Sequence, residues 1–259
     1  MLAGRHVLLP VVIDNLNADF TDDIRRAVPL SITIFYAQAF PHQVVVRAAE
    51  VDTQPHDTSY ISYLVVGIVV VGIMIGSLLQ AGSSAAREYE TGTIRELLLS
   101  PASRWAIVAG KTLGALTLNL LGTAMMLVVV VLVLGVRPLH WGAMIGLTFL
   151  IITIFVMLGT LIGMVIRRRA AVVPLSLGVA LPLFFLSGAF GPVTFVGPVV
   201  AWLARLFPLY YAMAVFQYAF HGFLTTTTSL SANILALVGF GGVAISASAV
   251  VLRRQVIIH

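Results

Sequence analysis

The chain has 259 residues, of which 59% are hydrophobic and 10% are charged. Soluble domains carry roughly a quarter charged residues, so this composition excludes an ordinary soluble protein and indicates a polytopic membrane protein. Because there is no cysteine, disulfides, thiolate nucleophiles and cysteine-based zinc sites are excluded as well. The formal net charge of +5 is explained by basic loops on one side of a membrane and does not indicate nucleic-acid binding.

Residues 1–58 are polar and predict a short extracytoplasmic segment. Two strand-like stretches, Val7 to Asp14 and Val44 to Val51, flank a region from Ile24 to Phe40, so we interpret the segment as the remnant of a small α+β ectodomain. Its aspartates lack the spacing of an EF-hand loop, which favours solvated turns over a calcium site. Met1 to Pro10 has neither the apolar core nor the cleavage site of a signal peptide. We therefore expect either that an upstream signal-anchor helix is missing or that the segment inserts unaided.

Five apolar stretches within residues 59–259 are long enough to span a bilayer, whose core of about 30 Å needs about 20 helical residues. Hydropathy therefore predicts an all-α membrane domain. The predicted spans are Tyr60 to Gln80, Ala106 to Leu134, Trp141 to Ile166, Ala171 to Ala189 and Ser231 to Leu252. Pairs of small residues, such as Gly159 with Gly163, predict that neighbouring helices approach closely.

Residues 190–223, between the fourth and fifth spans, are interrupted by prolines and rich in aromatic side chains. Proline is favourable in the first turn of a helix, so two short helices are expected to begin near Pro198 and Pro208. Both are too short to cross the bilayer, and rings such as those of Trp202 and Phe216 suit the headgroup level. We interpret the region as an extracellular re-entrant helical hairpin, with a sixth, aromatic-rich span as the alternative.

Lysine and arginine are distributed unevenly between the loops, and cytoplasmic loops retain positive charge during insertion. One set of loops holds most of them: Arg87, Arg95, Arg104, Lys111, Arg167, Arg168, Arg169, Arg253 and Arg254. The opposite loops contain Arg137 and Arg205, and residues 1–58 hold more acidic than basic groups. The bias predicts a multi-pass protein of the cell membrane with its N-terminus outside and its C-terminus in the cytoplasm.

A charged stretch, REYETGTIRELLLSP, runs from Arg87 to Pro101 between the first two spans. Thr93 and Glu96 have the spacing of a capping box, which predicts a short helix with its apolar residues on one face. Ser100 precedes Pro101, so this helix should end there and Ser100 should cap the next one. The pattern predicts a cytoplasmic elbow that contacts a soluble partner. The alternative is an ordinary loop whose glutamates balance the nearby arginines.

Catalysis within the membrane is the rival class of function, and it requires acids, bases or nucleophiles in the spans. The predicted spans contain no Asp or Glu, and the six histidines are scattered without metal-ligand spacing. Gly110, Lys111 and Thr112 imitate the end of a phosphate-binding loop, but Trp105 stands where that loop needs glycine. Lys111 is interpreted as a residue that extends to the inner interface. We therefore expect no catalytic or metal-binding residues, and any ATPase has to be a separate chain.

The charged elbow and its surroundings resemble the permease subunits of ATP-binding-cassette exporters of the ABC-2 type. The matching pattern is Arg87-Glu88, Glu90, Gly92-Thr93, Leu97 to Leu99, Ser100-Pro101 and Gly110-Lys111. A second match is FFLSGAFGP, from Phe184 to Pro192, followed by FPLYYAMAVFQYAFHG, from Phe207 to Gly222. Together these motifs extend the resemblance over residues 59–259.

The resemblance implies a six-helix half-transporter in which residues 87–101 form a coupling helix docked on a cytoplasmic ATPase subunit. The residues implied in ATPase coupling are Arg87, Glu88, Glu90, Gly92, Thr93, Arg95, Glu96 and Leu97. Those implied in the hairpin near the exit are Gly188, Pro192, Pro198, Pro208, Tyr210 and Tyr211. ATP and Mg²⁺ would be bound by the partner subunit, and this chain would bind no cofactor. The chain departs from the family pattern in lacking the first helix and most of the ectodomain.

The expected function is to couple ATP hydrolysis on that separate subunit to export of a hydrophobic or amphipathic substrate, such as a drug, a lipid or a lipid-linked glycan. Half-transporters pair, so a second permease copy in the bilayer is expected as a homodimer or a heterodimer. The alternative is a truncated accessory or relic subunit that binds the ATPase without transporting anything.

Overall fold

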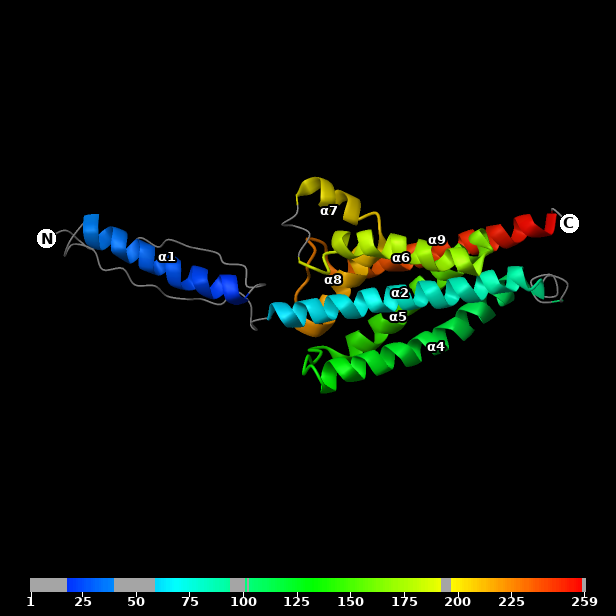
Figure 1. The fold of residues 1–259 in the computed structure, drawn as a ribbon, viewed down its shortest axis with the longest axis horizontal. Coiled ribbons are helices and arrows are strands. Elements are labelled where there is room, and N and C mark those ends of the chain that lie inside the picture. The colour runs from blue at the N-terminus through cyan, green and yellow to red at the C-terminus, as the bar shows by residue number, and fades with distance from the viewer. Residues whose placement is uncertain (1–17, 40–58, 94–100, 102, 192–196, 258–259) are drawn as a thin grey trace. The chain divides into compact units, whose positions relative to one another are not determined.

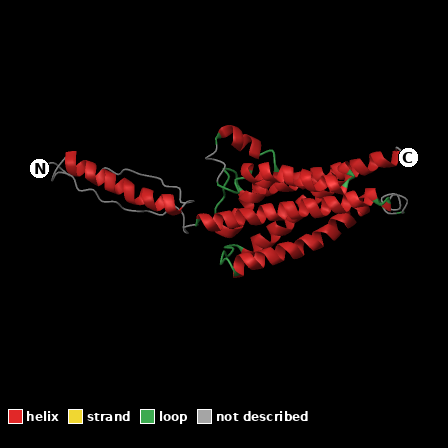
Figure 2. Cartoon of the chain, in the orientation of Figure 1, coloured by secondary structure: helices red, strands yellow, loops and turns green. Residues whose placement is uncertain are grey.

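The computed structural model describes residues 18–39, 59–93, 101, 103–191 and 197–257. Within those ranges all regular secondary structure is α-helix, with no strand (Figure 1 and Figure 2). The helices are α1 (Ala18–Ala39), α2 (Tyr60–Glu90), α4 (Arg104–Leu132), α5 (Trp141–Ile166), α6 (Arg169–Leu186), α7 (Pro198–Ala204), α8 (Pro208–His221) and α9 (Leu230–Ile257). The chain divides into two compact units, Met1–Ser62 and Tyr63–His259.

Helix α1 belongs to the first unit and covers most of the region from Ile24 to Phe40. It contains Pro29. The two strand-like stretches expected on either side, Val7 to Asp14 and Val44 to Val51, lie outside the described residues, so the α+β interpretation of this unit stays a prediction.

Five helices among the described residues are long and apolar enough to cross a membrane, which confirms the five predicted spans. They are Tyr60–Glu90, Ala109–Leu132, Trp141–Ile166, Arg169–Leu186 and Leu230–Val251. A sixth candidate arises if the bent pair α7 and α8 counts as one broken span. The described residues therefore form an all-α membrane fold.

Helix α2 continues well beyond the predicted end at Gln80, as far as Glu90. The prediction stopped there because hydropathy falls, but small and charged residues such as Ala85 and Arg87 are compatible with a helix. The first strong interruption is Gly92, whose φ of 77° lies in the left-handed region that favours glycine. As a result Arg87, Glu88 and Glu90 belong to the last turns of a membrane-spanning helix.

Helix α4 is capped by a different serine from the predicted one. The Ser103 hydroxyl accepts a hydrogen bond from the Ala106 amide at 3.2 Å, and the helix begins at Arg104. The prediction that Ser100 caps this helix with Pro101 in its first turn is therefore wrong. A cap must lie about three residues before a free backbone N–H, and Ser103 meets that requirement once the helix begins at Arg104.

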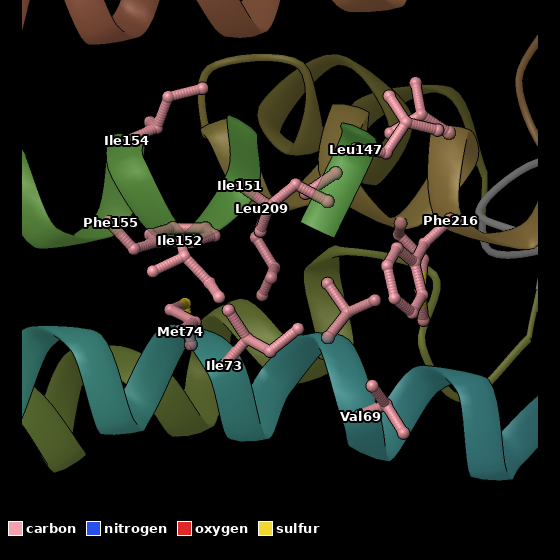
Figure 3. Packing of buried hydrophobic residues seen from close by; sticks show 14 of the residues in the cluster. Val69, Ile73, Met74, Leu147, Ile151, Ile152, Ile154, Phe155, Leu209 and Phe216 are labelled. Carbon is pink, nitrogen blue, oxygen red and sulfur yellow. The ribbon is translucent and has the colours of Figure 1, made fainter. Parts of the chain in front are cut away.

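The core of the second unit lies between α2, α5 and α8. Helix α5 is central, because it contacts α4, α6, α8 and α9. Figure 3 shows how side chains from the three helices interlock, and those labelled there are Val69, Ile73, Met74, Leu147, Ile151, Ile152, Ile154, Phe155, Leu209 and Phe216. Such a tightly packed core fixes the relative positions of the helices.

Glycines allow α2 and α5 to approach closely, as the small-residue pattern predicted. A Cβ atom on Gly159 would lie 2.9 Å from the Ser77 carbonyl oxygen, and one on Gly163 would collide with the carbonyl oxygen of Gly82. Only hydrogen side chains fit at such contacts. The pair therefore serves packing within one chain.

The helices α7 and α8 begin at Pro198 and Pro208, as predicted, and enclose an angle of 93°. The surroundings of α8 differ from a lipid interface, because α8 is almost entirely buried in the second unit, whereas most of α7 is exposed. Phe216 is fully buried and Tyr210 is 7% exposed, whereas Trp202 on α7 is 61% exposed. The aromatic side chains of α8 thus contribute mainly to the protein core.

Candidate functional site

The predicted site residues fall into two groups at opposite ends of α2. Arg87, Glu88 and Glu90 lie in its last turns, followed by Gly92 and Thr93. Three further residues predicted to take part in coupling, Arg95, Glu96 and Leu97, lie outside the described residues, as does Pro192 of the predicted hairpin. The remaining residues predicted for the hairpin lie just after α6, at the start of α7 or in the first turn of α8. They are Gly188, Pro198, Pro208, Tyr210 and Tyr211.

The end of α2 is closed by a compact turn. The amide of Thr91 donates a hydrogen bond to the Arg87 carbonyl at 2.9 Å, and the Thr91 hydroxyl donates to the same oxygen at 3.0 Å. The hydroxyls of Thr91 and Thr93 share a hydrogen bond of 2.8 Å across Gly92. The polypeptide therefore leaves α2 in a defined direction toward the segment that precedes α4.

Glu88 forms an ion pair with Lys111 of α4. The two side chains are only 22% and 12% exposed, respectively. They line a small cavity together with Ala85, Ala115 and Thr160 of α5. Lys111 was expected to extend to the inner interface, but it turns to Glu88 because α2 continues far enough to place a carboxylate beside it. The pair joins the two helices that flank residues 91–103.

Glu90 contacts a different segment, the connection between α5 and α6. Its Oε1 accepts a hydrogen bond of 2.8 Å from the backbone N–H of Arg169, the first residue of α6. Arg168, at the N-cap position, makes no capping bond with its own side chain. A carboxylate at a helix N-terminus satisfies a free N–H and interacts favourably with the helix dipole. Glu90 therefore acts as the cap of a helix remote in sequence.

Tyr89 adds a second contact with that connection. The guanidinium carbon of Arg167 lies 5.4 Å from the centre of the Tyr89 ring, which is the geometry of a cation–π interaction. Arg167 ends α5 with a φ of 58°, an unusual value for a residue with a side chain. The end of α2 thus contacts the α5–α6 connection through both Tyr89 and Glu90.

The structure brings Glu88 and Glu90 together at one site, but it gives them partners that the sequence did not indicate. Two residues apart on a helix, they project about 200° from each other, since a helix turns about 100° per residue. This angle is the only feature of the sequence that indicates separate partners for Glu88 and Glu90. It applies only if α2 extends through both residues, which hydropathy did not predict.

The second group is linked by a buried polar chain at the other end of α2. The hydroxyl of Tyr63, which is fully buried, donates to the Gly188 carbonyl at 2.5 Å. The Tyr63 carbonyl in turn accepts from Nε2 of Gln217 on α8 at 3.1 Å. Gly188 has a φ of 81°, so the turn after α6 depends on glycine. Tyr63 and Gln217 were absent from the predicted site.

Tyr210 and Tyr211 stabilise the corner between α7 and α8. Their rings meet edge to face with centres 5.2 Å apart, and the Tyr211 hydroxyl donates to the Arg205 carbonyl at 3.0 Å. Among the described residues there is no cluster of three or more potential metal ligands. Glu88 and Glu90 at one site and Tyr63 at the other are thus engaged in contacts between helices or their connections, an arrangement suited to transmitting motion.

The sequence is similar to a family of membrane transporters and to individual transport permeases. The family model described as ABC-2 type transporter matches residues 23–221. The inner membrane transport permease YadH of Escherichia coli strain K12 is 23% identical over 188 residues, which cover 71% of this chain and 73% of that protein. The proteins of the same name from Escherichia coli O157:H7 and Shigella flexneri match to the same extent.

Proposed function

The chain belongs to the ABC-2 type transporter family and is a multi-pass membrane transport subunit, and we propose that it couples ATP hydrolysis on a separate ATPase subunit to export of an apolar substrate. The family supports association with an ATP-binding subunit. The five candidate spans and the inner-membrane relatives support a location in the inner membrane.

The observation that carries the proposal is the network at the end of α2. A soluble ATPase can move membrane helices only through a contact that is rigid enough to transmit force. Residues 91–103 connect α2 to α4, and the Glu88–Lys111 ion pair fastens the two helices just beside that connection. A displacement of this connection would therefore reach both helices together.

Docking on the ATPase is assigned to the coupling segment, residues 87–101, with a division of roles. Arg87 and Thr93 are exposed, and Arg95, Glu96 and Leu97 complete the docking surface. Glu88 and Glu90 have partners within the chain, so they hold the segment in place. Positive charge on this side of the membrane domain, including Arg167 to Arg169, favours a cytoplasmic location for it.

The substrate is proposed to be hydrophobic or amphipathic: a drug, a lipid or a lipid-linked glycan. Large apolar side chains are exposed along α4 and α6, for example Leu121, Met125 and Leu181. Such surfaces suit lipid, a second permease copy or an apolar substrate better than an ion. The hairpin of α7 and α8, with Gly188, Pro198 and Pro208 at its bends, is proposed to form the exit on the outer side.

Purification of the tagged chain from native membranes in mild detergent tests the proposal. We expect an ATPase with a phosphate-binding loop to co-purify in near-equal amount, and reconstituted vesicles to move a fluorescent phospholipid only with ATP. A folded chain that purifies without any ATPase would contradict the proposal. An ATPase that binds but drives no movement of a phospholipid, a lipophilic drug or a lipid-linked glycan would instead support an accessory subunit.

A further inference from the structure

Helices α2 and α6 are connected by a hydrogen bond at each end. At one end the Arg169 amide, at the start of α6, donates to Glu90 at the end of α2. At the other end the Tyr63 hydroxyl, in the first turns of α2, donates to the carbonyl of Gly188, just after α6. The two helices therefore run antiparallel and are held together at both ends by these two hydrogen bonds, which we call pins.

Close packing lies beside each of the two hydrogen bonds, against Val172 of α6 and against Ala189 just after it. A Cβ atom on Gly82 of α2 would lie 2.9 Å from a methyl carbon of Val172, and one on Gly67 would lie 2.6 Å from the Ala189 carbonyl oxygen. These distances leave no room for a side chain. Contacts near each end thus reinforce the two hydrogen bonds.

The two helices differ in stiffness. Helix α6 contains Pro174 and Pro182, each of which removes an intrahelical hydrogen bond and makes the helix easier to bend. Helix α2 has 31 residues and no proline. When the ends of a compliant helix are attached to a stiff one, they follow it, so α6 cannot absorb a displacement of α2 by bending.

Each end of the α2–α6 pair lies beside one of the two groups of predicted site residues. The Glu90 end lies beside the connection to α4. At the Tyr63 end, α6 leads through Ser187 and Gly188 toward the hairpin, and the Tyr63 carbonyl also accepts from Gln217 of α8. The Ser187 hydroxyl donates to the Phe184 carbonyl at 2.8 Å, which fixes the turn. A movement at one end thus has a continuous path to the other.

We propose that α2 and α6 form a strut, pinned by Glu90 and Tyr63, that carries displacement of the coupling segment to the hairpin of α7 and α8. Glu90 and Tyr63 are then positioning residues. This inference rests on the proposed function for the source of the motion, but the pins themselves exist independently of it.

The hydrogen bond of Glu90 is tested first, without any ATPase, by amide hydrogen exchange in detergent. Replacing Glu90 by alanine should speed exchange at the Arg169 amide about tenfold, a factor that corresponds to about 1.4 kcal/mol and is typical of losing a helix cap. Glu90→Gln keeps a carbonyl oxygen and should restore protection. Unchanged exchange at Arg169 in Glu90→Ala would overturn the pin.

Transmission is tested in the complex with the ATPase subunit by distance measurements between spin labels. The chain has no cysteine, so labels can be placed at Trp202→Cys on α7 and Leu134→Cys after α4, both exposed. We expect ATP to shift this distance in the parent protein. Tyr63→Phe and Glu90→Ala should each abolish the shift. Tyr63 lies far from the coupling segment, so in Tyr63→Phe the loss of the shift should occur while ATP hydrolysis continues.

Thr153→Val is the matched control, because the Thr153 hydroxyl bonds the Phe149 carbonyl within α5 alone. This variant should keep the shift, and Glu90→Gln should regain it. A shift that persists in both pin variants, or that is absent from the parent complex, would overturn the strut. Failure of the ATPase subunit to bind the parent chain would instead contradict the proposed function, with the exchange experiment still deciding the pin at Glu90.

Discussion

At the residue scale, the candidate site is defined by carboxylates whose partners lie far along the chain. Glu88 pairs with Lys111 of α4, and Glu90 bonds the first amide of α6, which is 79 residues away. Glu88 has restricted access to water, so its charge needs a partner, because an unpaired charge there is costly. Glu90 is exposed, and its carboxylate is favoured at the α6 N-terminus by the free amide and the helix dipole. These contacts explain why a membrane-spanning helix ends in a charged turn.

The ion pair makes a direct prediction. Glu88→Ala leaves the ammonium group of Lys111 without its partner, so we expect a loss of roughly 1–3 kcal/mol in stability, the usual cost of an unsatisfied charged group. Thermal unfolding in detergent measures it, with the exposed Arg137→Ala as control. The exchanged pair Glu88→Lys with Lys111→Glu should recover most of the loss. Equal stability of Glu88→Ala and the parent chain would show that the pair contributes nothing.

Glycine contacts give a second prediction at this scale. A methyl group on Gly163 collides with the Gly82 carbonyl oxygen, whereas one on Gly178 of α6 meets nothing within 4 Å. Gly163→Ala should therefore destabilise the protein by roughly 1–3 kcal/mol, as overpacking does, and Gly178→Ala should not. Comparison of their melting temperatures is decisive, because two equally stable variants would exclude the close approach of α2 and α5.

At the scale of elements, the local signals and the long-range contacts differ in how far they can be predicted. The five spans follow from hydropathy, and the starts of α7 and α8 follow from Pro198 and Pro208, because these signals are local. The end of α2 was missed because hydropathy falls at Gln80 without any residue that breaks a helix. The partners of Glu88 and Glu90 were missed for the same reason, since they depend on where that helix ends.

The cap of α4 offers a test of the assignment at this scale. Ser103→Ala removes the acceptor of the Ala106 amide and should cost about 0.5–2 kcal/mol at the helix start. Faster hydrogen exchange at Ala106 reports the loss. Ser100→Ala, at the serine that the sequence suggested, should leave this amide unchanged. The opposite pattern would restore Ser100 as the cap.

At the scale of the whole molecule, the second unit combines a packed core with two polar sites at opposite ends of α2. Helix α5 and the buried α8 fix the core, while Glu90 and Tyr63 attach α6 to α2. A rigid core with defined attachments is what a transport subunit needs if an external ATPase is to move it, since packed interiors transmit displacement. The coupling segment is the point where that partner should bind.

The most direct test of this account is site-specific photo-crosslinking in native membranes, with a photoreactive amino acid in place of Leu97 in the coupling segment. The account predicts a crosslink to an ATPase that contains a phosphate-binding loop, and none from the same probe at the exposed Leu139 between α4 and α5. A crosslink from position 139, or none from position 97, would contradict the proposal that this segment binds the ATPase.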